Sequence, residues 1–440
     1  MAGSGPVQSQ RWRSWFRRQS LLPAALVIAF LHGLFYVVAI PPWDLFDEEQ
    51  HLAYVLTLRD EWRIPHVDDP IPGAILESAA TTDRWGAFRL GQPAAVDVDA
   101  IGLEGRSYEA YQPPLTYALL APVTAPAGAD VLRSLYLARL AGAALFTSLV
   151  GVAWALARQW FPDGGQAVAA SAALTLAAIP AAAQSAGRVS NDLLAAVLIS
   201  AGMLATTRLL DRPCLRTGLS LGALGAAALV TKSHGALLLP LIALALVLLW
   251  RQRRLAPSVA ALALLPGCVA ALAWSAFTYQ RYGVLDGSRA YLDRYQTYQP
   301  LSLEHFLRTF WLNSWSDYWG AYRGDIGGGW LLSVTNLALI TLIVMAIAHA
   351  LRHQRQHEAL VLVGVLALEM LIALVVANHT AIVRPGGRLL LPLYPALTVL
   401  IAASWRRIPF PAQVVPVAVV WALSLAHIGW WFLPFFYGDV

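Results

Sequence analysis

Apolar runs of about 18 to 25 residues follow one another along the chain, and they restrict its fold more than any other feature. A helix of that length crosses the roughly 30 Å of hydrocarbon in a bilayer. Of the 440 residues, 58% are hydrophobic and only 13% are charged, and the mean hydropathy is +0.56. These values exclude an ordinary soluble domain. The sequence therefore predicts an all-α polytopic membrane protein.

The runs and the basic residues between them predict a topology. About eleven runs are long enough to cross the bilayer: residues 21–40, 133–158, 166–187, 191–210, 214–231, 235–250, 257–278, 330–350, 359–377, 388–404 and 411–435. Arginines gather in the short connections after alternate runs: Arg158, Arg208, Arg212, Arg216, Arg251, Arg253, Arg254, Arg352, Arg355, Arg406 and Arg407. Cytoplasmic loops carry the excess of positive charge, so we expect the N-terminus inside and the C-terminus outside.

The outer side is predicted to have two long loops, at 41–132 and 279–329. Loops of that length are usually functional or contain structure of their own. Residues 48–59 are expected to form a short amphipathic helix. Its apolar side would present Leu52, Val55 and Leu56. Residues 113–126 are apolar but short for a span and are interrupted by Pro122, which predicts an interfacial or re-entrant helix.

Three further features bear on the class of protein. The basic residues raise the pI to about 9.3, but they are dispersed at the ends of spans and do not indicate nucleic-acid binding. Cys214 and Cys268 lie at or inside spans, so neither a disulfide framework nor a metal–thiolate site is expected. The fifth span contains closely spaced glycines that predict tight helix packing: Gly218, Gly222 and Gly225.

An acidic cluster lies just beyond the outer end of the first span. Asp47 and Glu48 are followed by His51, a few residues after Ile40. Charge is costly beside hydrocarbon, so such a cluster is a candidate functional site. Asp47 followed three residues later by Gln50 also fits a capping box at the start of a helix. Both interpretations stay open for Asp47.

Basic residues also occur in short outer turns, where the topology rule disfavours them. Their cost would be offset by a lipid-linked phosphate or an anionic headgroup, because Arg and Lys bind phosphate through charge-assisted hydrogen bonds. The alternative is that their side chains reach to lipid headgroups in general. The candidates for phosphate binding are Arg388, Lys232, Arg384, Arg188 and His234.

Four motifs on the predicted outer side resemble those of GT-C glycosyltransferases, in particular the protein O-mannosyltransferase and aminoarabinose-transferase branch. They are Asp47-Glu48-Glu49-Gln50-His51, Gln112-Pro113-Pro114-Leu115-Thr116-Tyr117, Ser190-Asn191-Asp192 and Gly387-Arg388-Leu389-Leu390-Leu391-Pro392. The resemblance implies a polyprenyl-phosphate sugar donor. Glu49 departs from the pattern, because a small residue or proline usually follows the Asp-Glu pair.

The resemblance implies inverting transfer, in which a carboxylate accepts the proton of the attacking hydroxyl. Asp47 is the candidate base, with Glu48 as a second catalytic residue. Glu48 and His51 fall on one helical face and would orient Asp47 or bind a cation. A surface Glu/His pair without function is the alternative.

The candidates for binding the acceptor or the sugar are His51, Tyr111, Gln112, Asn191 and Asp192. A turn before an interfacial helix would equally explain the prolines after Gln112, and Ser190, Asn191 and Asp192 are good helix-start residues. The candidate ligands for a divalent cation (Mg²⁺, Mn²⁺ or Ca²⁺) are Asp47, Glu48, His51 and Asp192. Catalysis without a metal is the alternative.

The resemblance also implies an organisation and partners. Residues 1–20 would be a basic cytoplasmic N-terminus leading into an uncleaved signal anchor, 21–404 a GT-C-like catalytic domain, and 405–440 the last span with an outer C-terminus. The partners would be a polyprenyl-phosphate-linked sugar, membrane lipid, and a hydroxyl acceptor on protein, lipid or polysaccharide. The identities of the sugar and of the acceptor stay open.

The Ala- and Arg-rich composition is typical of a high-GC bacterium, which predicts an undecaprenyl or decaprenyl carrier and an inner-membrane protein with an outward-facing site.

A transporter or flippase for a lipid-linked or small polar substrate is the alternative function. Glu369 lies in the middle of the 359–377 span, where a carboxylate needs a partner or a proton. His32 and His427, in the first and last spans, are candidate partners. Clear internal repeats, which many transporters show, are not evident.

Overall fold

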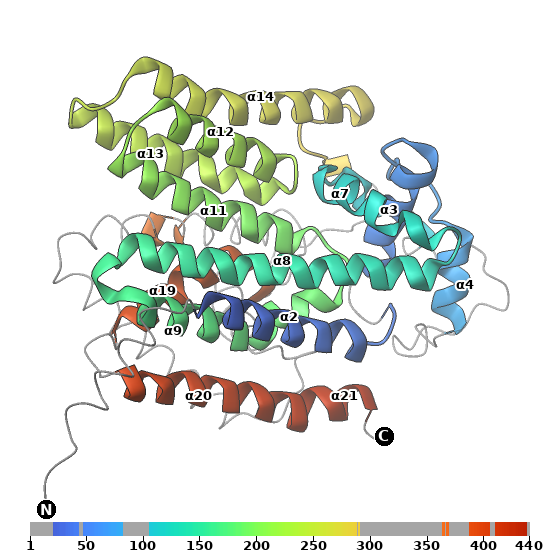
Figure 1. Ribbon diagram of the computed structural model, residues 1–440. Coiled ribbons are helices and arrows are strands. Elements are labelled where there is room, and N and C mark those ends of the chain that lie inside the picture. Colours follow the sequence, from blue (N-terminus) through green and yellow to red (C-terminus); the bar gives the residue numbers. More distant parts are fainter. Residues whose placement is uncertain are drawn as a thin grey trace, which may run out of the picture.

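The computed structural model describes residues 21–43, 47–81, 105–287, 289–290, 363–365, 367–368, 387–404 and 410–437. Within these residues the regular structure is helical (Figure 1). The α-helices are α2 (Leu22–Ala39), α3 (Glu48–Glu61), α4 (Gly73–Thr81), α7 (Leu115–Thr124), α8 (Val131–Trp160), α9 (Gly165–Ala178), α10 (Pro180–Gln184), α11 (Asp192–Asp211), α12 (Leu215–Leu229), α13 (Leu238–Arg251), α14 (Pro257–Tyr282), α19 (Tyr394–Ser404), α20 (Phe410–His427) and α21 (Leu433–Tyr437). The prediction of an all-α protein is confirmed for this part of the chain.

Six helical segments among the described residues are long and apolar enough to cross a membrane. They are Leu22–Ala39, Val131–Trp160, Asp192–Asp211, Ser233–Arg251, Pro257–Tyr282 and Gln413–Trp430. The bent pair Gly165–Ala178 and Pro180–Gly187 makes a seventh if it is one span. The predicted span 330–350 lies outside the described residues, as does most of 359–377, including Glu369. The total of eleven spans and the N-in orientation stay predictions.

The predicted span 166–187 is broken rather than straight. Its two helices, α9 and α10, meet at an angle of 65°. Pro180 begins α10 and has no N–H to donate, which interrupts the hydrogen-bond ladder at this point. The Nδ1–H of His32 in α2 donates to the carbonyl of Ala177, 2.7 Å away. The histidine expected to partner Glu369 thus satisfies a backbone carbonyl at the break.

Glycines let α12 and α14 approach closely, as the sequence predicts. A Cβ atom on Gly218 would lie 2.9 Å from the carbonyl oxygen of Val259. On Gly222 it would lie 2.1 Å from the carbonyl oxygen of Leu262, which is a clash with backbone. Gly225 is different, because its nearest neighbour would be the Ile242 side chain at 3.4 Å, an ordinary contact. The close approach therefore depends on Gly218 and Gly222.

The described part of the predicted outer loop 41–132 contributes to a second, smaller core at one end of the bundle. In Figure 1, α3, α4 and α7 gather around the end of α8 where that helix begins. Their buried apolar side chains form a cluster separate from the core of the bundle. Among its members are Trp43, Leu52, Ile75, Tyr117 and Leu135. The 30-residue α8 is about 45 Å long, so it contributes to both cores.

Two expectations about this loop have clear outcomes. The helix predicted at 48–59 is present as α3, but the predicted one-sided pattern is wrong, because every residue from Glu48 to Thr57 is buried. The reason is that α3 packs against α7 and the 3₁₀ turn Tyr108–Tyr111 instead of lying on a surface. The stretch predicted at 113–126 forms α7, a short apolar helix of 10 residues with Pro122 inside it.

Candidate active site

A buried ion pair fixes the start of α3. The Arg139 guanidinium of α8 donates to both carboxylate oxygens of Glu48, with distances of 2.9 Å from Nε to Oε1 and 2.6 Å from Nη2 to Oε2. Both side chains are fully buried. The same carboxylate accepts the backbone N–H groups of Val189 at 2.9 Å and Trp43 at 3.3 Å. Each oxygen of Glu48 therefore receives two hydrogen bonds.

The Arg139 guanidinium is satisfied as completely as its partner. Its Nη1 donates to the carbonyls of Ile40 at 2.6 Å and Val37 at 3.4 Å, and its Nη2 donates to Pro41 at 3.0 Å. These carbonyls lie at the C-terminal end of α2, where a helix has no donors of its own. One arginine thus joins α2, α3 and α8. Glu48, predicted as a catalytic residue, is engaged in holding this junction together.

Asp47 is positioned differently from its neighbour. Its backbone is left-handed, with φ at 63°, which is uncommon for a residue other than glycine and often marks a functional site. Its side chain makes no capping hydrogen bond to α3, so the capping-box alternative is not realised. The hydroxyl of Tyr108 donates to its Oδ1 at 2.6 Å. The Asp47 carboxylate is only partly buried and is oriented by this phenol.

His51 lies one turn further along α3. Its Nδ1 is 2.8 Å from the Tyr117 hydroxyl of α7, and the two rings stack at an interplanar angle of 19°. Burial lowers the pKa of His51 to about 4, with smaller opposing effects from Asp47 and Asp192, which raise it. Lys232 and Arg188 lower it further. His51 is therefore neutral at physiological pH and lies within electrostatic range of four predicted site residues.

Asp192 joins the two predicted phosphate-binding cations. Its Oδ1 accepts the Lys232 ammonium and its Oδ2 accepts the Arg188 guanidinium. Asp192 and Arg188 are buried, whereas the Lys232 side chain keeps 15% of its surface exposed. Two cations on one carboxylate leave a local charge of about +1, which attracts an anion. The structure thus brings Lys232 to Asp192 and Arg188, which lie four residues apart at the start of α11.

The predicted sugar-binding residues connect the same turns. The Asn191 amide donates from Nδ2 to Oε1 of Gln112 at 3.1 Å and to the Thr231 carbonyl at 3.4 Å. Asn191 occupies the position before α11 but makes no capping bond there, so the helix-start alternative does not account for its side chain. The Gln112 carbonyl accepts the Tyr54 hydroxyl at 3.2 Å. Tyr111 precedes Gln112 at the end of a short 3₁₀ turn, Tyr108–Tyr111.

The other predicted phosphate-binding residues are located here only by the segment of the chain to which they belong. His234 lies in the 3₁₀ segment Ser233–Leu237, two residues after Lys232. The backbone of Arg388 belongs to the 3₁₀ segment Gly387–Leu393 that enters α19. Arg384 lies outside the described residues.

A divalent-cation site is not assembled from the predicted ligands. Within the part of the chain that the structure describes, no three His, Cys, Asp or Glu side chains are grouped so as to hold a metal ion. Two of the four predicted ligands, Glu48 and Asp192, are already engaged by basic side chains.

Three residues of the site were missed by the sequence analysis. They are Arg139, Tyr108 and Tyr117. Arg139 gave a usable signal, because a charged residue inside an apolar run needs a partner. Tyr117 ends the Gln112–Tyr117 motif, which was the signal for it, whereas Tyr108 gave none, since its role depends on the packing of the 3₁₀ turn against α3.

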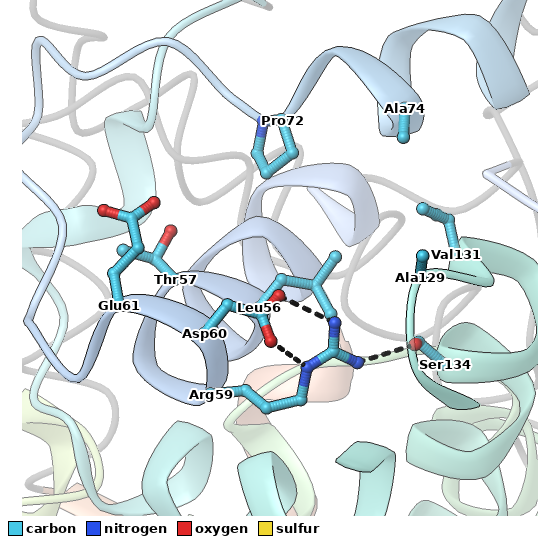
Figure 2. Close-up of a pocket in the computed structure, with 10 residues that line it drawn as sticks. All are labelled: Leu56, Thr57, Arg59, Asp60, Glu61, Pro72, Ala74, Ala129, Val131 and Ser134. Atoms are coloured by element: carbon cyan, nitrogen blue, oxygen red, sulfur yellow. Dashed lines mark hydrogen bonds and ion pairs between the residues drawn. The ribbon is translucent and has the colours of Figure 1, made fainter. Parts of the chain in front are cut away.

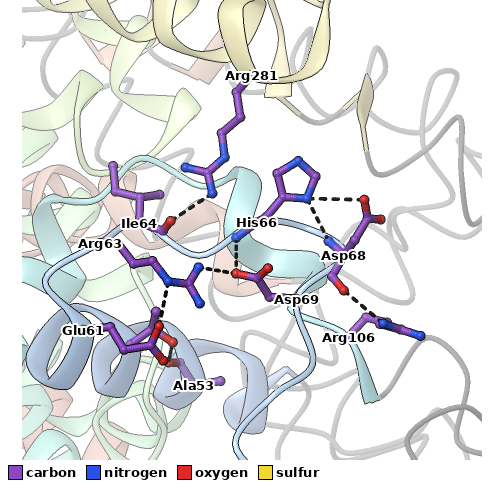
Figure 3. Close-up of polar contacts among 10 residues, drawn as sticks. Ala53, Glu61, Arg63, Ile64, His66, Asp68, Asp69, Arg106 and Arg281 are labelled. Carbon is purple, nitrogen blue, oxygen red and sulfur yellow. Dashed lines mark hydrogen bonds and ion pairs between the residues drawn. The ribbon is translucent and has the colours of Figure 1, made fainter.

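Polar contacts also tie the chain after α3 to the bundle (Figure 3). Arg63 pairs with Glu61 and Asp69, and the Asp69 carboxylate accepts the His66 backbone N–H at 2.8 Å. The Arg281 guanidinium of α14 donates to the Ile64 carbonyl at 2.9 Å. These contacts connect α3 to the end of α14, where the second predicted outer loop begins.

A cavity of about 210 Å³ lies at the opposite end of α3 from Asp47 (Figure 2). Arg59 projects into it and binds Asp60 and the Ser134 hydroxyl. Asp47 is 12 residues before Arg59, or about 18 Å along a helix. None of the predicted site residues lines this cavity.

Comparisons with known proteins give a family and a fold. Residues 30–397 match the family model described as "Predicted membrane protein (DUF2142)". No curated protein matches the chain. The structure is similar to ArnT from Cupriavidus metallidurans bound to undecaprenyl phosphate, with a TM-score of 0.54 and 18% identity over 93% of this chain and 64% of that one. The apo state of the same protein gives 0.53 and 19%, over 96% and 65%. The chain thus spans a little under two thirds of ArnT, and the likeness shows a shared fold.

Proposed function

The chain belongs to the DUF2142 family of predicted membrane proteins, and we propose that it is a membrane glycosyltransferase that takes a sugar from a polyprenyl-phosphate donor. One observation carries this proposal. In an ArnT-like fold, the partly exposed Asp47 precedes Glu48, whose carboxylate accepts the Val189 N–H from the same turn that carries Arg188 and Asp192, and Asp192 also binds Lys232. Transfer from a phosphate leaving group needs a base and a cation in this arrangement.

The proposed reaction is an inverting displacement. Asp47 takes the proton from an acceptor hydroxyl while the hydroxyl oxygen bonds to the anomeric carbon. The bond between that carbon and the phosphate oxygen breaks, and the lipid phosphate leaves with its electron pair. Negative charge grows on the phosphate, so Lys232 and Arg188 stabilise the transition state more than the bound donor. Arg388, Arg384 and His234 are further candidates to contact the phosphate.

The other site residues act through these groups. Tyr108 orients the Asp47 carboxylate. Glu48 positions Asp47 by fixing the first turn of α3 against Arg139, rather than by touching the substrate. ArnT is bound to undecaprenyl phosphate in one of the two similar structures, and we propose a carrier of that class here. We place the site on the outer face of a bacterial inner membrane, with a hexose or pentose as the sugar and a hydroxyl on protein, lipid or polysaccharide as the acceptor.

The test is transfer of radiolabelled sugar by purified protein in nanodiscs. The donors would be a panel of polyprenyl-phosphate sugars and the acceptors crude envelope, with and without EDTA. Asp47→Asn should lower transfer about 10²- to 10⁴-fold while keeping donor binding and thermal stability. Lys232→Met should lower transfer and, unlike Asp47→Asn, should also weaken donor binding. Unchanged transfer by Asp47→Asn would remove the proposed mechanism.

A second candidate function is transport of a lipid-linked or small polar substrate. The observation that favours it is the 65° break between α9 and α10, because broken helices occur at substrate sites of transporters. Substrate-dependent flux in proteoliposomes without sugar turnover would support this alternative.

A further inference from the structure

Asn191 has a buried acceptor that the described residues leave unused. Its Nδ2 donates to two acceptors, Oε1 of Gln112 and the carbonyl of Thr231. Two acceptors at one end fix which end of the amide carries the nitrogen. The other end, Oδ1, is buried and has no hydrogen-bond partner among the described residues. Asn191 itself is 1% exposed.

Thr116 provides a second unused group close by. Its hydroxyl is buried, also with 1% of the residue exposed, and finds no partner in the described structure. A helical threonine often bonds the carbonyl four residues earlier. Here that carbonyl belongs to Gln112 and accepts the Tyr54 hydroxyl. The residue before Thr116, Leu115, donates its N–H to the Val230 carbonyl at 2.9 Å, so Thr116 is tied to the turn that carries Lys232.

Both groups belong to segments that are hydrogen-bonded to the turn carrying Lys232. Asn191 contacts the carbonyl of Thr231, and the next residues of the same two segments, Asp192 and Lys232, form an ion pair. The unused Oδ1 atom of Asn191 is thus one residue away in sequence from Asp192, and Asn191 bridges the two turns that carry Asp192 and Lys232. A sugar attached to a phosphate is separated from it by one glycosidic oxygen. Groups beside the phosphate site are therefore placed to meet the sugar.

An unsatisfied buried polar group is costly, and a ligand that hydrogen-bonds to it recovers that cost. The Asn191 Oδ1 atom only accepts, so it fits a group that donates. The Thr116 hydroxyl donates or accepts. Sugar hydroxyls do both. Resting on the proposed function, we infer that Asn191 and Thr116 bind hydroxyl groups of the donor sugar and so contribute to the choice of sugar.

The test compares the binding of two probes to the protein in nanodiscs. The first probe is undecaprenyl phosphate without a sugar. The second is undecaprenyl phosphate bearing mannose, arabinose or aminoarabinose, and the sugar that binds most tightly is used. The measured quantity is the ratio of their dissociation constants. Asn191→Leu and Thr116→Val should each lower the preference for the sugar-bearing probe by about fivefold, the worth of one neutral hydrogen bond. Binding of the bare lipid phosphate should change little.

Thr175→Val is the matched control, because Thr175 is also buried with an unpartnered hydroxyl in the described structure but lies within α9. It should leave the ratio unchanged. Asn191→Asp keeps an acceptor oxygen, so it should weaken both probes through repulsion of the phosphate while keeping their ratio. This variant separates recognition of the sugar from a general loss of structure.

The outcomes separate sugar recognition from the proposed function itself. A normal affinity for bare lipid phosphate with an unchanged ratio in Asn191→Leu and Thr116→Val would overturn the inference alone, and the two groups would then bind water. Equal weakening of both probes by Asn191→Leu would also overturn it, as a purely structural effect. Failure of the unsubstituted protein to bind undecaprenyl phosphate would overturn the proposed function, and this inference with it.

Discussion

The Arg139 guanidinium and the Glu48 carboxylate, 91 residues apart in the chain, form a fully buried bidentate pair that joins the end of α2 to the beginning of α3. The pair lies directly beside the left-handed Asp47, whose carboxylate is the proposed base. Buried pairs of this kind are costly to desolvate and tolerate little displacement. The geometry of Asp47 therefore depends on a residue far away in the sequence.

Arg139→Met should destabilise the protein by about 3–5 kcal/mol, because it leaves the Glu48 carboxylate buried without its cation. The measurement is the loss of thermal stability in detergent, with transfer activity followed in parallel. The double variant Glu48→Leu/Arg139→Met should recover only part of the loss, since the guanidinium also binds carbonyls of α2. Full recovery would show that these carbonyl contacts contribute little.

His51 should make the protein less stable in mild acid. Its pKa is about 4 in the folded protein and about 6.5 when unfolded, so the unfolded chain binds more protons between these values. Stability is complete above pH 6.5 and falls by on the order of 3 kcal/mol as the pH drops to about 4. His51→Phe should flatten this part of the profile, measured as melting temperature against pH. An equally steep profile in the variant would assign the effect to other groups.

Tyr108→Phe should lower kcat about tenfold with little change in KM. It removes the hydrogen bond to Asp47, and such a bond to a charged group is worth about 1.5–3 kcal/mol. Tyr117→Phe is the comparison, because it removes a buried phenol hydroxyl from the His51 contact instead. Steady-state transfer kinetics measures both. A loss confined to KM in Tyr108→Phe would indicate a role in binding rather than in orienting the base.

Gly222→Ala and Gly225→Ala test the packing of α12 with neighbouring helices. The added methyl at Gly222 would lie 2.1 Å from the Leu262 carbonyl and should destabilise the protein by about 1–3 kcal/mol. At Gly225 the nearest atom is a side-chain methyl at 3.4 Å, so the higher helix propensity of alanine should make that change neutral or stabilising by up to about 1 kcal/mol. Equal melting temperatures for the two variants would contradict the described packing.

The sequence predicted candidate positions for the site but not the contacts between them. Asp192, Lys232 and Arg188 were predicted at the outer turns, and they meet. The contact between Lys232 and Asp192 was not predicted, because nothing in a single sequence states which turns are adjacent. The one-sided burial expected for α3 was wrong for the same reason, since the helices that cover its other side come from distant segments.

The sequence by itself determined which segments are apolar and which short turns carry charge, because hydropathy and loop length are local properties. It could not separate the roles of Asp47 and Glu48, which are adjacent and chemically alike. That separation came from tertiary structure: Arg139 and two backbone N–H groups surround Glu48, while the left-handed backbone directs Asp47 toward Tyr108. Desolvation and hydrogen bonding depend on neighbours in space, and only the fold brings those neighbours together.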